Sequence, residues 1–413
     1  MTGGTRGRTS GPSGICSHMD GHTAWEGCHA GVTIDPVSAA AVRVGFLGAG
    51  FIAAAHARSL RQAEAPVVWA GVHDPDHARA ESFAARTGAV VCDSEDEVIE
   101  GCDAVYVCTW TSEHLRLVEA AAGRGRAVFC EKPLATDLTD ARRMTKAVAD
   151  AGVVNQVGLV LRRSPGFQLV RDLVRDPASG RVMAVMFRDD QFLPVQGIYA
   201  STWRGDAARA GAGVLIEHSI HDVDLLERLI GPVDSVTARS AAFHDLAGIE
   251  DAVAATLHFG GGAVGSLVSV WHDMLERPNQ RHLEVVCQSR WIGLDNDWHG
   301  PVRWRQAGEP ERVLEGETLV AEARRRGLPH GNPDGAFIAS VLVGEPAWPD
   351  FAAALQAHAV VDAIYRSCAA GGRPITIPPD DTATLEPEDA APASHRAAAP
   401  GLPGLGTQPV APG

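Results

Sequence analysis

Residues 42–53 read VRVGFLGAGFIA, and this stretch decides the fold of the first part of the chain. The apolar run 42–47 is typical of a buried strand, and a helical pattern follows over residues 54–63. Between them, Gly48 turns the chain and Gly50 lets the backbone approach a ligand, next to the free N–H groups of a helix N-terminus. This pattern favours a bound pyrophosphate, although a glycine-rich turn in an ordinary α/β protein is the alternative. The candidate cofactor-binding residues here are Gly48, Gly50, Phe51 and Ile52.

Strands alternate with helices after this turn, up to about residue 160. The expected strands are 67–73, 89–92, 104–108, 127–130 and 153–159. Such alternation implies right-handed βαβ crossovers and a parallel sheet, whose ligands lie beyond the carboxyl ends of the strands. We therefore predict an α/β fold that begins with a Rossmann domain over residues 41–160.

Polar residues at the ends of these strands are placed to contact a dinucleotide. Asp74 follows the second strand, where a carboxylate accepts hydrogen bonds from the adenosine ribose hydroxyls. Because it would repel a 2′-phosphate, NAD is expected rather than NADP. The alternative is that Asp74 only caps the helix that begins near Pro75. Thr109 and Trp110 follow the strand 104–108 and belong to the same predicted edge.

The second half of the chain has a different pattern, rich in strands. The expected strands are 182–187, 235–241, 252–259, 263–270, 283–287 and 291–294, and the expected helices are 167–175, 214–229 and 351–370. The turn 260–262, three glycines, indicates a hairpin. We predict an α+β substrate-binding and oligomerisation domain over residues 161–377, with a large, mainly antiparallel open sheet. Residues 1–40 and 378–413 are expected to be a disordered leader and a disordered tail.

Composition excludes some classes of partner. The formal net charge of −15 argues against nucleic acid and against an anionic membrane surface, and so favours a small-molecule partner. The 8 cysteines form no CxxC pair, and no apolar segment is long enough to span a bilayer. Cysteines and histidines in the leader match no zinc pattern, so no metal is expected. These features predict a soluble, cytoplasmic protein.

The stretch 129–133, FCEKP, ends a predicted buried strand with a charged pair and a proline. Charged groups at the end of a buried strand are costly if they serve only packing, so chemistry is expected there. Glu131 and Lys132 are therefore candidate cofactor-binding residues. The alternative for Lys132 is a surface lysine paired with Glu131.

Three motifs in this order resemble the Gfo/Idh/MocA family of nicotinamide-dependent sugar oxidoreductases, over residues 42–377. They are the opening turn 48–56 (GAGFIAAAH), the tripeptide 131–133 (EKP) and the stretch 211–224 (GAGVLIEHSIHDVD). The last is similar to the family pattern GGGxLxDxxxHxxD, with Glu217 in place of aspartate and Ala212 in place of the middle glycine. Within the family, residues 108–110, 128–136 and 161–163 look most like the inositol dehydrogenase branch.

The resemblance implies a dehydrogenase that acts on a secondary alcohol of a sugar, polyol or cyclitol. Such a reaction needs a base at the hydroxyl proton, and His221 is the candidate because its ordinary pKa lies near neutrality. Glu217, four residues earlier on a predicted helix, would share a face with His221 and hold its tautomer. Lys132 would bridge substrate and nicotinamide ribose and stabilise the alkoxide. A packing role is the alternative for His221.

Two further residues are predicted to contact the substrate. Arg162 would contact substrate hydroxyls and Trp203 would wall the pocket with its aromatic face. A solvated arginine and a packing tryptophan are the alternatives. The open face of the second sheet predicts a homodimer or homotetramer. Two other functions remain open: a lyase or hydrolase that uses transient oxidation with tightly bound NAD, and a non-catalytic regulator that senses NAD and a sugar.

Overall fold

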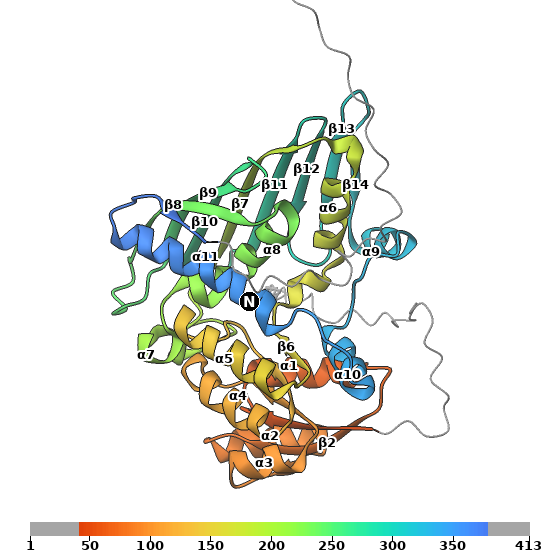
Figure 1. Ribbon diagram of the computed structural model, residues 1–413, viewed down its shortest axis with the longest axis vertical. Coiled ribbons are helices and arrows are strands. Elements are labelled where there is room, and N and C mark those ends of the chain that lie inside the picture. Colours follow the sequence, from red (N-terminus) through yellow and green to blue (C-terminus); the bar gives the residue numbers. More distant parts are fainter. Residues whose placement is uncertain (1–40, 379–413) are drawn as a thin grey trace, which may run out of the picture. The chain divides into compact units, whose positions relative to one another are not determined.

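Figure 1 shows the computed structural model, which describes residues 41–378. The predicted disordered leader, residues 1–40, and residues 379–413 of the predicted tail lie outside the described residues. Two β-sheets organise the described part of the chain, one of six strands and one of nine. The first is built from residues before 158 and the second from residues after 181.

The first sheet is parallel throughout, in the order β3-β2-β1-β4-β5-β6. Its strands are β1 (Val42–Leu47), β2 (Val67–His73), β3 (Val90–Val91), β4 (Ala104–Val107), β5 (Ala127–Cys130) and β6 (Asn155–Val157). The helices between them are α1 (Phe51–Leu60), α2 (His77–Thr87), α3 (Glu95–Gly101), α4 (His114–Gly123) and α5 (Leu138–Ala151). The strand order reverses between β1 and β4, which is where ligands bind in open α/β sheets. The predicted Rossmann sheet is confirmed.

Both faces of the first sheet are buried, which explains its continuous apolar strands. One face packs against α1, α2 and α10 (Pro333–Val343), and the other against α3, α4, α5 and the start of α11 (Phe351–Ala369). Rings of neighbouring strands stack inside the first of these layers: Tyr106 lies 4.9 Å from Phe46 and 4.7 Å from Phe129 between ring centroids. These buried rings hold β1, β4 and β5 in line, so that their carboxyl ends meet at one edge.

The second sheet has the order β14-β13-β12-β11-β7-β10-β9-β8-β15. Its strands are β7 (Val182–Phe192), β8 (Val233–Ala241), β9 (Ala252–Phe259), β10 (Val264–His272), β11 (Gln280–Cys287), β12 (Arg290–Asp295), β13 (Val302–Gln306), β14 (Arg312–Leu314) and β15 (Ile375–Thr376). Neighbours are antiparallel except for β7 and β10, which run parallel at the centre. The mainly antiparallel sheet that we predicted is confirmed, and the glycine turn 260–262 joins β9 to β10.

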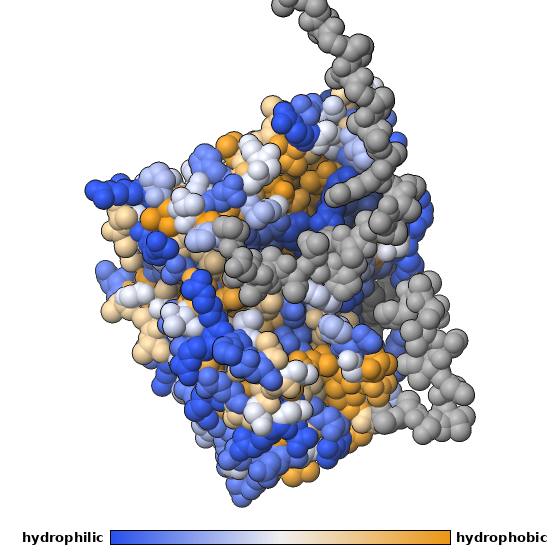
Figure 2. All heavy atoms as spheres, in the orientation of Figure 1, coloured by the Kyte–Doolittle hydropathy of each residue, from blue (hydrophilic) through white to orange (hydrophobic). Residues whose placement is uncertain are grey.

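Helices cover one face of this second sheet. In Figure 1, α6 (Pro165–Arg175), α8 (Ile220–Ile230) and α11 lie in front of its strands. Burial alternates strictly along β9, as expected when one face packs against helices and the other does not. Figure 2 shows the helix-bearing side, where hydrophilic residues gather over the helices of the first sheet at the bottom of the view.

Several predicted boundaries need correction. We expected three helices after residue 160, but α9 (Gly316–Arg325) and α10 are also present, and so are the short α7 (Ala207–Ala210) and strands β13 and β14. The helix α1 begins at Phe51 rather than at residue 54, because Gly50 already occupies the N-cap position. The predicted helix 214–229 is divided: a π-helical turn, Leu215–Ser219, precedes α8. We call this segment the π-turn.

The π-turn begins where backbone and carboxylate groups of Glu250 hold it. The carboxylate of Glu250 accepts hydrogen bonds from the N–H groups of Gly213 at 2.8 Å and Leu215 at 3.0 Å, and its carbonyl accepts one from Val214 at 2.9 Å. A Cβ atom on Gly213 would lie 1.8 Å from that carbonyl oxygen. Gly211 has φ +92, so it too requires glycine. The alanine between them, Ala212, replaces the one glycine of the motif that the turn does not need.

Gly213→Ala is therefore expected to destabilise the protein by about 1–3 kcal/mol, because backbone atoms of Glu250 cannot move aside cheaply. Chemical denaturation followed by circular dichroism measures this change. Ala212→Gly is the matched control, with an expected cost of about 0.4–1 kcal/mol from chain entropy. Equal losses in the two variants would contradict the packing account of this turn.

Candidate active site

The glycine turn after β1 leaves room for a ligand on one side only. Gly48 has φ +90, and a Cβ atom there would lie 2.5 Å from the carbonyl oxygen of Cys108. A Cβ atom on Gly50 would meet nothing within 4 Å, because Gly50 faces open space at the start of α1. An open N-terminal helix turn of this kind fits a pyrophosphate. Phe51 is 54% exposed beside it, and Ile52 is partly buried in the layer under α1.

Asp74, at the carboxyl end of β2, is tied to this turn. Its carboxylate accepts hydrogen bonds from the N–H groups of Ala49 at 2.8 Å and Asp76 at 2.9 Å. The N-cap of α2 is Asp76 and not Asp74, so helix capping does not account for Asp74. The side chain lies at the edge predicted for a ribose.

Thr109 and Trp110 follow β4 at the same carboxyl edge. The guanidinium of Arg209, on α7, lies 3.8 Å from the ring centroid of Trp110. A Cβ atom on Gly211 would lie 2.9 Å from Thr136, which follows β5 along the chain. The segment that precedes the π-turn therefore packs against the carboxyl edge of the first sheet.

The side chain of Glu131, directly after β5, is buried. Its carboxylate lies 2.8 Å from Nε2 of His56, whose Nδ1 lies 2.7 Å from the carboxylate of Asp334 on α10. All three side chains are buried. Burial lowers the pKa of His56, but the two carboxylates outweigh it and raise that pKa to about 10. The carboxylate that we predicted at the cofactor is thus engaged in an ion triad under the loop.

Lys132 links the end of β5 to the π-turn. It follows Glu131, and its Nζ donates a hydrogen bond of 2.6 Å to the main-chain carbonyl of Glu217 in the π-turn. A π-helical turn changes the register of the helical hydrogen bonds, and such turns are frequent at functional sites. The backbone beside Lys132 is held by His114, whose Nδ1 lies 3.0 Å from the carbonyl oxygen of Pro133.

Glu217 has a different partner from the one that we predicted. Its Oε1 accepts a 2.6 Å hydrogen bond from Nε of Arg204 and lies 4.0 Å from Nζ of Lys132. Burial raises the pKa of the Glu217 carboxyl, but the charges of Arg204 and Lys132 outweigh it and hold the pKa below its ordinary value. We expected Glu217 to hold the tautomer of His221, but the guanidinium of Arg204 takes its carboxylate instead.

His221 is the second residue of α8 and is 8% exposed. Its Nδ1 is buried without a hydrogen-bond partner. Burial, and then the charges of Lys132, Arg281 and His218, lower the pKa of His221 well below its ordinary value. The imidazole is therefore neutral at physiological pH.

Arg281 is a site residue that sequence reasoning missed. This buried side chain on β11 donates to Asp222 at 2.6 Å and to His218 at 2.8 Å, and lies 3.2 Å from Asp189. It thereby links the first turn of α8 and the π-turn to the centre of the sheet. The signal was present: Arg281 is in register with the buried positions Leu283 and Val285 of the same strand, so it faces the core.

The two predicted substrate residues lie in different surroundings. Arg162, in the short helical turn Val160–Arg163, forms a two-pronged ion pair with Asp224 on α8, with contacts of 2.9 and 2.6 Å. Trp203 lies next to Arg204, whose guanidinium carbon is 4.8 Å from the Trp203 ring centroid. Trp203 is thus near the π-turn, whereas the guanidinium of Arg162 is directed at the body of α8.

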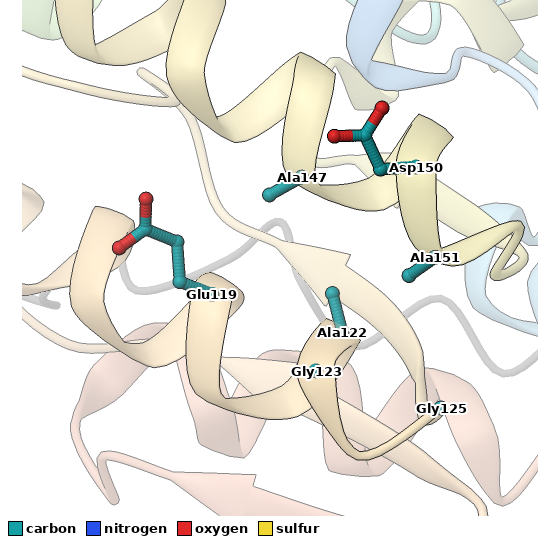
Figure 3. Close-up of a pocket in the computed structure, with 7 residues that line it drawn as sticks. All are labelled: Glu119, Ala122, Gly123, Gly125, Ala147, Asp150 and Ala151. Carbon is teal, nitrogen blue, oxygen red and sulfur yellow. The ribbon is translucent and has the colours of Figure 1, made fainter.

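A depression of about 470 Å³ between α4 and α5 is a poor alternative site (Figure 3). Alanine and glycine residues line most of it, and its two carboxylates are already paired, Glu119 with Arg143 and Asp150 with Lys146. It lies near the amino ends of β5 and β6, whereas ligands of parallel sheets bind at the carboxyl ends. In residues 41–378, no cluster of three or more metal-ligating side chains occurs and no helix could cross a bilayer.

Fold and site together define a dinucleotide-binding α/β protein with a second, mainly antiparallel sheet. Residues 42–159 match the profile of the oxidoreductase family with an NAD-binding Rossmann fold, and residues 167–292 match the GFO/IDH/MocA C-terminal domain. These matches span more than half of the chain, which belongs to the Gfo/Idh/MocA oxidoreductase family. The predicted family and its cofactor, NAD, are confirmed.

Individual relatives agree with this assignment. Inositol 2-dehydrogenase of Rhizobium meliloti (strain 1021) is 35% identical over 212 residues, which cover 50% of this chain and 60% of the relative. The 1,5-anhydro-D-fructose reductase of Ensifer adhaerens is 34% identical over 39% of this chain and 48% of its own. The chain therefore spans less than two thirds of these relatives.

Solved structures show the same fold. The WlbA dehydrogenase from Bordetella pertussis, in complex with NADH and UDP-GlcNAcA, is 26% identical, with a TM-score of 0.71 over 84% of this chain and 100% of that chain. Levoglucosan dehydrogenase in complex with NADH has a TM-score of 0.72 at 22% identity, over 82% of this chain and 100% of that chain.

The His56 triad predicts a pH-dependent stability. The pKa of His56 in the folded protein, about 10, exceeds its ordinary value of 6.5. The contribution of His56 to the free energy of unfolding is therefore complete below pH 6.5 and is lost as the pH rises to about 10. Between these pH values, the unfolding free energy of the wild type should fall by several kcal/mol more than that of His56→Gln, as measured by urea denaturation. The exposed His77→Gln should keep the wild-type slope, and a wild-type slope in His56→Gln would refute the triad's role.

Proposed function

We propose that this chain is an NAD-dependent oxidoreductase that transfers hydride between nicotinamide and a secondary alcohol of a sugar, polyol or cyclitol. The observation that carries the proposal is the hydrogen bond from Nζ of Lys132 to the carbonyl of Glu217, which precedes the neutral His221 of α8 by one helical turn. Relatives named as inositol dehydrogenases support the same reaction class.

The catalytic residues of the proposal are Lys132 and His221. The neutral imidazole of His221 accepts the hydroxyl proton of the substrate, and the ammonium of Lys132 donates a hydrogen bond to the oxygen on which charge develops. Bound NAD supplies the acceptor for the hydride. Glu217 acts through Lys132 and Arg204 rather than as a base, because its carboxyl has a lowered pKa.

The other predicted site residues take supporting roles in this proposal. Gly48, Gly50, Phe51 and Ile52 form the pyrophosphate turn, with Thr109 and Trp110 at the same edge. Asp74 accepts from the ribose hydroxyls with the lone pairs that its two amide contacts leave, which favours NAD over NADP. Trp203 walls the substrate pocket. Arg162 holds α8 through Asp224, and Glu131 holds the loop from below.

We also propose that the chain works in the cytoplasm and has two domains, residues 41–160 and 161–377. The six cysteines of the described part are all free, as is usual in a reducing compartment.

A screen of inositols, sugars and other polyols with NAD and with NADP, read by nicotinamide absorbance, tests the proposed reaction. We expect turnover with NAD, and a loss of about 100-fold or more in kcat/KM for Lys132→Met, since the ammonium acts in the transition state. The fluorescence titration of NADH should show that the variant still binds cofactor. A fully active Lys132→Met would refute the mechanism, and turnover of a substrate without added NAD would favour the lyase or hydrolase.

The open face of the second sheet supports a homodimer or homotetramer. Apolar side chains such as Val264 and Val268 on β10 are 46% and 38% exposed there. Light scattering coupled to size-exclusion chromatography should give a dimeric or tetrameric mass, and Val268→Asp should lower it, because a carboxylate is costly to bury in an interface. A monomeric wild type would contradict this prediction.

A further inference from the structure

Arg204 occupies a position that the proposed reaction does not explain by itself. It lies on the short turn Thr202–Gly205, between the end of β7 and the π-turn. Its guanidinium carbon lies 4.8 Å from the ring centroid of Trp203 and 6.0 Å from that of Tyr199. Two aromatic faces thus support the guanidinium, which leaves its Nε directed at Glu217.

Arg204 and Lys132 face the same oxygen atom. Oε1 of Glu217 accepts the hydrogen bond of Arg204 at 2.6 Å, while Nζ of Lys132 stands 4.0 Å from it. Glu217 is 3% exposed, so solvent does not satisfy its charge. A buried carboxylate needs a direct cationic partner. In this structure that partner is Arg204, and Lys132 donates to the neutral carbonyl of the same residue instead.

We propose that Arg204 is a positioning residue that holds the carboxylate of Glu217 away from the ammonium of Lys132. This inference rests on the proposed function, in which Lys132 stabilises a substrate alkoxide. An ammonium group has three donors, and one already binds the Glu217 carbonyl. A direct ion pair with the carboxylate would take a second donor and neutralise the charge that the alkoxide needs. Arg204 keeps the carboxylate at 4.0 Å from the ammonium, so that the second donor of Lys132 stays available for the alkoxide.

The longer arm of Glu217 suits this arrangement. Glutamate stands here in place of the aspartate of the family pattern. Its side chain is one methylene group longer, and its carboxylate reaches the guanidinium of Arg204. Glu217 and Arg204 are therefore a matched pair in this chain.

Substitution of Arg204 and of its partner tests the proposal. Arg204→Met should lower kcat by about tenfold or more, because Glu217 then pairs with Lys132. The KM for NAD should stay near the wild-type value. The double variant Arg204→Met/Glu217→Gln should be more active than Arg204→Met, since the neutral amide no longer binds the ammonium tightly. Arg204→Lys, which retains a cation, should recover part of the loss.

A double variant no more active than Arg204→Met would overturn the proposal, because a structural or substrate-binding arginine is not rescued at Glu217. Arg143→Met is the matched control: it removes an exposed arginine that pairs with Glu119 on α4, and should leave kcat unchanged. Thermal unfolding checks that every variant is folded.

Crystal structures of the wild type and Arg204→Met give a second test that needs no activity. The 4.0 Å separation of Lys132 Nζ and Glu217 Oε1 should close to direct contact in the variant. An unchanged separation would overturn the inference, even if no sugar proves to be a substrate. Failure of the proposed function appears separately, as a wild type without turnover.

Discussion

One hydrogen bond, from the ammonium of Lys132 to the main-chain carbonyl of Glu217, connects the end of β5 in the first sheet to the π-turn before α8. Two sets of local contacts position these groups. On one side, β5 ends in a loop that the buried triad of Glu131, His56 and Asp334 supports from below. On the other, Glu250 holds the start of the π-turn at Gly213, in a contact that admits no side chain. The lysine and the turn are thus each fixed by contacts within the chain.

Charge is distributed so that the imidazole at the start of α8 stays neutral. Burying a charge costs several kcal/mol unless a partner offsets the loss of water. The chain meets this requirement by pairing: His56 lies between two carboxylates, and Arg281 contacts Asp222 and Asp189. His221, in contrast, is buried near the cations Lys132 and Arg281, so its neutral form is favoured over its protonated form. In the proposed reaction, the neutral imidazole of His221 and the ammonium of Lys132 then contact the same oxygen of the substrate alcohol.

Much of the fold could be predicted from sequence because its signals are local. The alternation along residues 252–259 gave the bounds of β9, and the glycines after β1 indicated the turn. The strand β13 reads VRWRQ, whose alternation has only two apolar residues, and its hydrogen bonding to β12 and β14 is a signal that a single short stretch does not carry. Residue types could not reveal the π-turn, because an ordinary helix period fits residues 214–229 equally well. Partners distant in sequence, such as Arg204 for Glu217 and Asp334 for His56, follow only from the folded chain.

The central claim is that Lys132 and His221 meet at a single alcohol oxygen beside the nicotinamide. A crystal structure of the chain with NADH and a polyol or sugar that it turns over tests this claim most directly. We expect one substrate oxygen within about 3 Å of both Nζ of Lys132 and the imidazole of His221. A substrate bound so that its reacting oxygen contacts neither side chain would contradict the account.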